Sequence, residues 1–260
     1  MSDSLLIDIN DRVALLTLNR PAARNALSSE LLRALPDAIV AADSNDNVDV
    51  IVLTGADPAF CAGLDLRELG SSGDNLAGGP SSDHQWGTPW PDITKPIIGA
   101  VNGAAVTGGF EIALNCDFLI ASENAKFGDT HARVGLMPGW GLSVLLPQAV
   151  GVRRAREMSL TGNFMGAEEA LAFGLVNRVV AHDELLPVTL SVAADIAGNE
   201  QTGVRALLAE YREITASIYE EGLIIEAEKA RGWNSRRGSF DPAEVEKRRA
   251  AIIERGRKMV

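Results

Sequence analysis

The sequence has few cysteines, few basic residues and no long apolar run, and each shortage excludes a class of protein. Only Cys61 and Cys116 occur among the 260 residues, which indicates reduced thiols and not a disulfide framework. The formal net charge of -11 and the pI near 4.8 disfavour nucleic acid or an anionic membrane as the main partner. No apolar run approaches the roughly 18 residues of a membrane span, and the start lacks the features of a signal peptide. We therefore expect a cytoplasmic protein.

The sequence also lacks two kinds of pattern that define other folds and sites. No spacing of cysteine and histidine is typical of a metal centre, so we predict no metal. No tandem repeat of the solenoid type is present. His84 and His182 have no chemical context in the sequence, and we expect both on the surface.

Strand-like and helix-like segments alternate through the first half of the chain. Apolar spacing and Ser28 or Ser29 as N-cap predict a helix that includes residues 31–42, in which Pro36 introduces a kink or starts a new helix. The alternation favours strand and helix units with mostly parallel pairing. The predicted strands cover residues 13–18, 48–54, 96–101, 117–121 and 176–180.

Two regions differ from this alternation. Residues 70–92 are rich in glycine, proline and serine, and we expect either a mobile flap that places Trp86 and Trp90 over a pocket or an ordinary flexible insertion. From about Leu185 onward helical patterns dominate, and Asp241-Pro242-Ala243-Glu244 has the order typical of a helix start. The tail is thus expected to be a helical appendage that is useful for self-association.

The segment from Val101 to Glu111 carries a candidate acid/base next to a candidate anion site. Gly108 and Gly109 follow an apolar run, and glycines at a strand-to-helix junction let backbone N–H groups approach a ligand closely. Glu111 lies one helical turn later, and its side chain leans back toward the same place. The alternative is that Glu111 only interacts with the helix dipole, which is worth about 0.3–1 kcal/mol.

A second glycine-bearing stretch, from Ala59 to Leu66, repeats this arrangement. Taken with other short motifs, the two stretches resemble the crotonase family, also called the enoyl-CoA hydratase/isomerase superfamily. The resemblance covers nearly the whole chain. The further motifs are Asn19-Arg20-Pro21, Asn25-Ala26-Leu27, Lys95-Pro96, Ala125-Lys126-Phe127-Gly128, Gly135-Leu136-Met137-Pro138 and Leu160-Thr161-Gly162.

The resemblance implies an α/β fold, a crotonase-like ββα spiral over residues 1–195, followed by a helical trimerisation region over residues 196–260. Family members form trimers that often pair into hexamers. By resemblance, the N–H groups of Leu64 and Gly108 polarise an acyl-CoA thioester carbonyl, and Glu111 is an acid/base. Coenzyme A then enters as part of the substrate, and no separate cofactor is expected. The residues implied to contact it are Arg24, Ala26, Ala62, Gly63, Leu64, Asp65, Leu66 and Gly108.

The chain departs from the family at the position of the second glutamate, which is His131 here. An imidazole can relay a proton, or it can form a neutral hydrogen-bonding wall. If the stretch is extended, Asp129, His131 and Arg133 share a face, and Asp129 then fixes the histidine tautomer. Trp140 occupies a loop where relatives carry other catalytic acids, and it either lines the acyl end of the pocket or is structural.

The resemblance therefore predicts an enzyme that adds water to a 2-enoyl-CoA through a thioester enolate. The loss of the second glutamate keeps two alternatives open. One is an isomerase, in which a single base shuttles a proton, although the base of family isomerases often lies at the position of His131. The other is a crotonase-fold protein that binds acyl-CoA and catalyses little.

Overall fold

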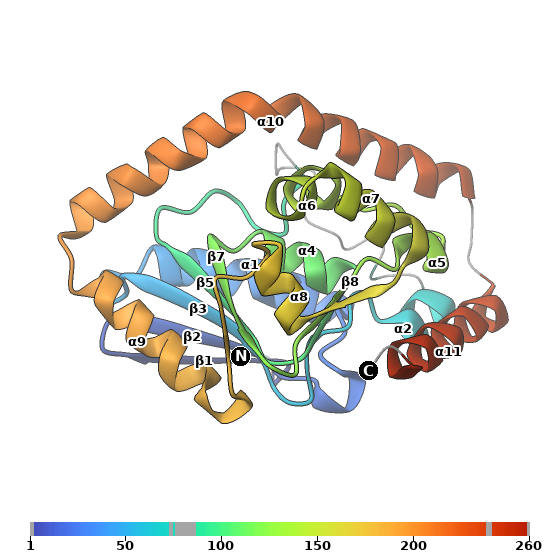
Figure 1. Cartoon of the computed structure of the whole chain (residues 1–260), viewed down its shortest axis with the longest axis horizontal. Coiled ribbons are helices and arrows are strands. Elements are labelled where there is room, and N and C mark those ends of the chain that lie inside the picture. Colours follow the sequence, from blue (N-terminus) through green and yellow to red (C-terminus); the bar gives the residue numbers. More distant parts are fainter. Residues whose placement is uncertain (1–2, 73–74, 76–86, 238–240, 259–260) are drawn as a thin grey trace.

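The computed structural model of the chain describes residues 3–72, 75, 87–237 and 241–258. Two packed β-sheets and the helices around them form the body, and one long helix runs across its edge (Figure 1). The predicted flap lies mostly outside the described residues, and so do His84 and Trp86. Trp90, which is described, is buried.

The larger sheet has six strands in the order β1-β2-β3-β5-β7-β10. Strand β1 pairs with β2 in antiparallel fashion, and the other neighbours are parallel. The predicted parallel pairing is thus largely confirmed. The six strands are β1 (Leu5–Asn10), β2 (Val13–Leu18), β3 (Val50–Gly55), β5 (Ile97–Val101), β7 (Phe118–Ser122) and β10 (Arg178–Val180).

The smaller sheet is built from four short strands in the order β4-β6-β8-β9. Strands β3, β5 and β7 each lead into one of its parallel strands and then into a helix, which confirms the predicted ββα units. Strand β9 pairs with β8 in antiparallel fashion. The elements are β4 (Ala59–Cys61), β6 (Ala104–Val106), β8 (Lys126–Gly128), β9 (Phe164–Gly166), α2 (Leu66–Ser71), α4 (Gly108–Leu114) and α5 (His131–Val134).

All five predicted strands are present, but β1 and the four strands of the smaller sheet were not predicted. Strand β1 begins with three consecutive apolar residues and alternates only from Ile7 to Asn10, so its period of two is short, and five of its six side chains are exposed. Each strand of the smaller sheet spans three residues, which is too short for a period of two to stand out.

The central strands are buried on both faces, because helices cover each side of the larger sheet. In β3, Ile51 and Leu53 face the main core, whereas Val50 and Val52 face helix α9. This division follows from the alternation of side chains along a strand. A continuous apolar run is typical of such doubly covered parallel strands.

Helix α1 (Ser29–Asp43) forms as predicted, with the Ser28 hydroxyl accepting the N–H of Leu31 at its start. Pro36 lies inside this single helix, so it does not start a new one. Among the described residues, no helix has the length and apolar character needed to cross a membrane. The remaining elements of the body are η1 (Pro21–Ala23), α6 (Leu142–Val150), α7 (Val152–Thr161), α8 (Ala167–Ala172), η2 (His182–Glu184) and α9 (Leu185–Ala197).

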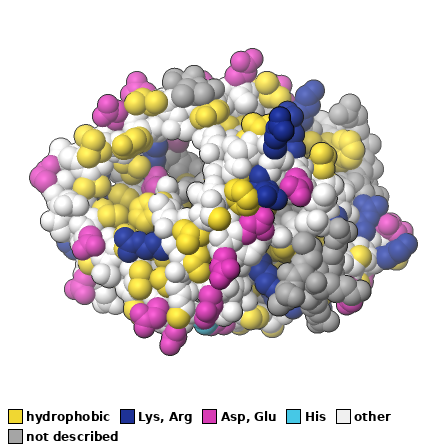
Figure 2. Space-filling model, in the orientation of Figure 1, with side chains coloured by type: hydrophobic (Ala, Val, Ile, Leu, Met, Phe, Trp, Pro, Cys, Tyr) yellow, Lys and Arg dark blue, Asp and Glu magenta, His cyan; other side chains and the backbone are white. Residues whose placement is uncertain are grey.

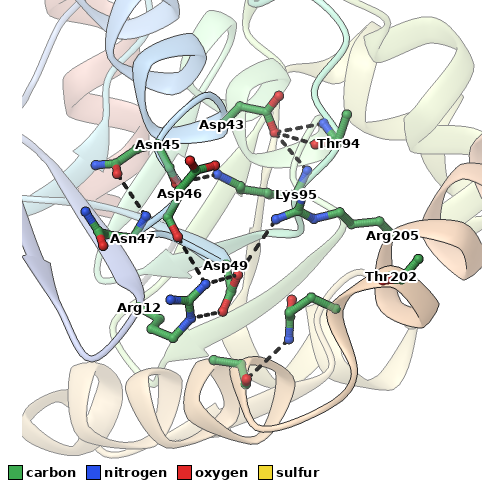
Figure 3. Close-up of polar contacts among 12 residues, drawn as sticks. Arg12, Asp43, Asn45, Asp46, Asn47, Asp49, Thr94, Lys95, Thr202 and Arg205 are labelled. Atoms are coloured by element: carbon green, nitrogen blue, oxygen red, sulfur yellow. Dashed lines mark hydrogen bonds and ion pairs between the residues drawn. The ribbon is translucent and has the colours of Figure 1, made fainter.

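The C-terminal region consists of α10 (Gln201–Arg237) and α11 (Pro242–Lys258). Helix α10 crosses the molecule and α11 returns to lie beside α2 (Figure 1). Arg205 of α10 reaches Asp49 at the start of β3, where Arg12 also binds (Figure 3). Arg212 pairs with Asp117 at 3.0 Å, which ties the first half of α10 to the sheet.

A buried lysine binds carbonyl oxygens at the C-terminal end of α1. Lys95 is 2% exposed, and its Nζ donates to the carbonyl oxygens of Ala42 at 3.0 Å and Asn45 at 2.8 Å. Asp43 accepts the backbone N–H groups of Thr94 and Lys95 (Figure 3). Burial lowers the pKa of Lys95, and the charge of Asp43 opposes that effect.

Substituting Lys95→Met tests how much these two hydrogen bonds contribute to stability. Methionine keeps most of the apolar volume but leaves the Ala42 and Asn45 carbonyls without their donor, so we expect a loss of about 1–3 kcal/mol in the free energy of unfolding. Urea unfolding at matched protein concentration measures the loss. Lys229→Met, on the exposed side of α10, is the control and should leave the midpoint unchanged. A Lys95→Met midpoint equal to that of the wild type would show that the two bonds contribute nothing.

Candidate active site

The centre of the site is the place where the end of β4 meets the start of α4. Gly109 packs so closely that a side-chain carbon there would overlap the carbonyl oxygen of Cys61. Gly63 has a φ of +82°, and a side-chain carbon there would overlap the hydroxyl of Thr107. Thr107 itself has a φ of 49°, a conformation that costs a non-glycine residue about 1–3 kcal/mol and is concentrated at functional sites.

This junction brings the two predicted N–H groups to the same region. The Leu27 N–H donates to the Gly63 carbonyl, and the Asp65 N–H donates to the Leu27 carbonyl. These two bonds form a parallel β-bridge between Leu27 and Leu64, in which the N–H of Leu64 points away from Leu27. Gly108 begins α4, where an N–H has no intrahelical acceptor. Within the described part of the chain, neither the Leu64 nor the Gly108 N–H has a hydrogen-bond partner.

The residues implied to contact coenzyme A lie along the same junction. The segment containing Arg24 and Ala26 runs beside residues 62–66, and the Ala62 N–H donates to the Arg24 carbonyl at 3.0 Å. Arg24 is exposed and Ala26 is buried. The structure thus places the predicted set in one neighbourhood, which comprises Arg24, Ala26, Ala62, Gly63, Leu64, Asp65, Leu66 and Gly108.

Asp65 has two structural partners that the sequence did not reveal. Its side chain caps α2 by accepting the N–H groups of Arg67 and Glu68, and it pairs with Arg20 at 2.9 Å. Arg20 also donates to the Ala26 carbonyl. Arg20 therefore joins the two segments of the junction, although the sequence marked it only as part of a family motif.

Glu111 is held by backbone from a distant segment. The residue is 3% exposed, and its Oε1 accepts the N–H groups of Gly139 at 3.0 Å and Trp140 at 2.8 Å. Asn115 donates to the carbonyls of both Glu111 and Trp140, which fastens the two segments. The side chain of Glu111 is thus occupied by tertiary contacts and does more than interact with its own helix dipole.

The second oxygen of Glu111 faces His131. The distance between Glu111 Oε2 and His131 Nε2 is 3.5 Å, and both residues are buried. On the other side of the ring, His131 Nδ1 lies 2.7 Å from Asp129 Oδ1. The three side chains therefore form a chain from Asp129 through the imidazole to Glu111.

One part of the sequence prediction for this segment is wrong. His131 begins α5, so the stretch is not extended and the three alternating residues do not share a face. Arg133 instead donates to the carbonyls of Thr161 and Gly162. The pairing of Asp129 with His131 is confirmed, because a carboxylate two residues before a helical histidine reaches both its ring and its backbone N–H.

The charges around the imidazole decide its protonation. Burial acts to lower the pKa of His131, but the charge of Glu111 and the hydrogen bonds with Asp129 and Glu111 outweigh it and raise the pKa to about 10. Burial acts against ionisation of Asp129, but its hydrogen bond with His131 holds its pKa below the usual value. The surroundings thus favour a protonated His131 ring between Asp129 and Glu111.

Apolar side chains border the two N–H groups. The Trp140 ring and Leu27 both lie beside Gly108, at 3.5 Å and 3.2 Å from the position that a side-chain carbon on Gly108 would take. Trp140 is half-buried and packs against the main core. Its position thus fits both roles predicted for it, the acyl wall and the structural residue.

The contacts of two side chains were missed from the sequence. His182 is partly exposed, in line with the surface position predicted for it, but it has partners that the sequence did not reveal, because its Nδ1 lies 2.9 Å from Ser122 Oγ and its Nε2 lies 3.1 Å from Asp57 Oδ2. Glu226 of α10 is buried close to Glu111, although more than 100 residues separate the two in the sequence. The sequence indicates a buried position for Glu226 only in that this charged residue shares a helix face with the apolar residues Leu223, Ala227 and Ala230.

Comparison with known proteins identifies the class of this fold and site. A family model described as enoyl-CoA hydratase/isomerase matches residues 8–236, and the chain belongs to this family. The crystal structure of an enoyl-CoA hydratase from Mycobacterium smegmatis is similar, with 57% identity, a TM-score of 0.82, and coverage of 90% of this chain and 100% of that chain. The predicted family and fold are confirmed.

Two relatives of known name span most of this chain. A probable enoyl-CoA hydratase from Rhizobium meliloti is 45% identical over 198 residues, which are 75% of this chain and 76% of the relative. A crotonyl-CoA hydratase from Syntrophomonas wolfei is 34% identical over 238 residues, which are 87% of this chain and 88% of the relative.

Replacing Asp129 tests the origin of the imidazolium. We expect the ring signals of His131 to titrate near pH 10 in the wild type, and at clearly lower pH in Asp129→Asn, because the substitution removes the negative charge beside Nδ1. NMR titration of ring-labelled histidine measures this for the three histidines of the chain. Asp57→Asn is the matched control, since it changes the surroundings of His182 and leaves His131 alone. A His131 titration near pH 6.5 in the wild type would contradict the assignment.

Proposed function

We propose that the protein is an enoyl-CoA hydratase, which adds water to a 2-enoyl-CoA to form a 3-hydroxyacyl-CoA. The observation that carries this proposal is the buried pair of Glu111 Oε2 and His131 Nε2, 3.5 Å apart, in the fold of the enoyl-CoA hydratase/isomerase family. A carboxylate that accepts a proton and an imidazolium that donates one are the two groups that hydration requires. The hydratase names of the relatives support the same reaction.

The Leu64 and Gly108 N–H groups are proposed to bind the thioester oxygen. Both N–H groups lack protein partners among the described residues, and the close packing at Gly63 and Gly109 brings the two segments that carry them together. Negative charge develops on that oxygen when the enolate forms. Donors already aimed at this charge stabilise the transition state more than the ground state, because they need no reorganisation during the reaction.

The proton transfers follow from the charges of the two side chains. Glu111 Oε2 accepts a proton from water while the water oxygen bonds to Cβ of the enoyl group and the electron pair moves to the thioester oxygen. His131 Nε2 then gives its proton to Cα, and the thioester carbonyl re-forms. The product has gained one water, and the enzyme is left with a protonated Glu111 and a neutral His131.

The direct contact between the two groups then restores the starting state. A proton passes from Glu111 Oε2 to His131 Nε2, because His131 has the higher affinity for it while Asp129 is charged. Meanwhile Glu111 Oε1 stays bound to Gly139 and Trp140, so only Oε2 takes part. Histidine thus replaces the second glutamate of the family as the proton donor, with Asp129 as its support.

Substrate recognition is proposed to follow the predicted coenzyme A path. Arg24 is an exposed cation at the edge of the junction, which suits a phosphate, and Asp65 to Leu66 border the same path. Coenzyme A is carried in by the substrate, and neither a further cofactor nor a metal is part of the proposal. A cytoplasmic location likewise remains a prediction from the sequence.

We further propose that the chain assembles as a homotrimer, or as a hexamer of two trimers. Helix α10 carries large apolar side chains on its outer side, where Leu207 is 60% and Tyr211 is 71% exposed. Figure 2 shows apolar side chains along the rim formed by α10 and in the hollow beneath it. A helix with apolar residues toward solvent is stabilised when another subunit covers it. The division at residue 195 between the spiral and this region also stays a prediction.

Turnover of crotonyl-CoA tests the reaction. We expect the wild type to bleach the absorbance of the conjugated thioester, and Glu111→Gln or His131→Gln to lower kcat by about 10²–10⁴-fold, because each removes one proton transfer. Longer enoyl-CoAs are assayed in parallel. Glu210→Gln, on the exposed side of α10, is the control and should match the wild type.

The other outcomes separate the alternatives. Tight binding of acyl-CoA without turnover would favour a binding protein. Movement of the double bond without addition of water, followed by product analysis, would favour an isomerase. Full activity in Glu111→Gln would rule out the proposed proton transfers.

Sedimentation equilibrium tests the assembly. We expect a mass three or six times the 27.6 kDa of the chain, and Tyr211→Glu should shift it toward smaller species, because the substitution places a charge in the covered surface. Glu213→Lys on the same helix, already charged, serves as the comparison. A monomer at micromolar concentration would contradict the proposal.

A further inference from the structure

Helix α10 is fastened to the loop that holds Glu111. Four residues on one face of α10 contact this loop, at positions 223, 226, 230 and 233, which is the spacing of a helix face. Trp233 Nε1 donates to the Gly135 carbonyl at 3.0 Å. Ala230 lies against Gly139, and Leu223 lies against Gly141. Small residues at two of these contacts let the helix approach the loop closely.

Glu226 is the buried charge on this face. It is 7% exposed, and its two oxygens accept the N–H groups of Gly141 and Ser143, both at 2.5 Å. These N–H groups belong to the start of α6, where a helix offers unpaired donors and a positive dipole end. Burial and the charge of Glu111 raise the pKa of Glu226, and the bonds to Ser143 and Gly141 oppose that rise.

The loop from Gly139 to Ser143 therefore lies between two carboxylates. Gly139 and Trp140 donate to Glu111 Oε1, and Gly141 and Ser143 donate to Glu226. The loop is thus bonded to both carboxylates, so a displacement of the loop changes its bonds to both. The position of Glu111 Oε2, which faces His131, thus depends on where Glu226 holds the loop.

We propose that Glu226 is a positioning residue, which holds the loop 139–143 so that Glu111 presents Oε2 to water and to His131. The proposal rests on the role of Glu111 as the base, and it assigns a task in catalysis to the C-terminal helical region. Glu226 itself does not touch the reacting atoms. It acts through the Gly139 and Trp140 N–H groups and through its charge close to Glu111.

Glu226→Gln tests the positioning. Glutamine keeps the size of the side chain, but its amide group faces a backbone N–H and the charge is gone. We expect kcat to fall by about 10–100-fold, the range for residues that orient a catalytic group, with KM changed less than about threefold. Because a negative charge near Glu111 is removed, the acid limb of the kcat–pH profile should move to lower pH. A role limited to folding would leave that limb in place.

Two controls make the result decisive. Glu228→Gln, exposed on the same helix, should leave kcat, KM and the pH profile unchanged. Glu226→Asp keeps the charge but shortens the side chain, so it should lower kcat without moving the acid limb. If Glu226→Gln proves unstable, Glu226→Asp and its kcat carry the test. A kcat within twofold of the wild type in both Glu226 variants would overturn the proposal.

An NMR measurement separates this proposal from the reaction itself. His131 contacts Glu111 Oε2, so displacement of Glu111 in Glu226→Gln should shift the titration of the His131 ring to lower pH in the absence of substrate. An inactive wild type with this shift would reject the hydratase reaction and keep the positioning. A hydratase whose His131 titration is the same in both proteins would keep the reaction and reject the positioning.

Discussion

The close approach of β4 and its following turn to the start of α4 is the constraint on which the site depends. Gly63 and Gly109 permit this approach, since a side-chain carbon at either position would overlap a neighbouring oxygen. Two ββα units are thereby brought into close contact at two glycines. The contact leaves the N–H groups of Leu64 and Gly108 without protein partners in the described structure, which is the feature a thioester oxygen requires. The strained φ of Thr107 belongs to the same contact.

Around this contact, the protein surrounds one buried imidazole with two carboxylates. Burial alone would favour a neutral His131, but the charge of Glu111 and the hydrogen bonds with Asp129 and Glu111 more than compensate for it. The ring Nε2 of His131 lies 3.5 Å from Glu111 Oε2. Such a pair provides an acid and a base in one place, which two equal carboxylates achieve only by sharing a proton.

The C-terminal region takes part in the same arrangement. Helix α10 is held at the sheet by Arg205 and Arg212, and at the loop 135–143 by Glu226 and Trp233. Its outer side carries exposed apolar side chains, among them Leu207 and Tyr211. One helix thus connects the surface proposed for assembly with the loop that holds Glu111. This connection gives a physical reason for a long helix that adds little to the main core.

Much of this protein was determined by local sequence. The long strands, helix α1 and the ββα order were predictable, because apolar periodicity and glycine-bearing turns act over a few residues. The same holds for Leu64, Gly108 and Glu111, whose positions follow from short motifs. Tertiary structure alone decided three features: the raised pKa of His131, the hydrogen bonds from the Gly139 and Trp140 N–H groups to Glu111 Oε1, and the buried position of Glu226 beside Gly141. These depend on burial and on charges brought together from distant segments, and neither quantity is set by the order of neighbouring residues.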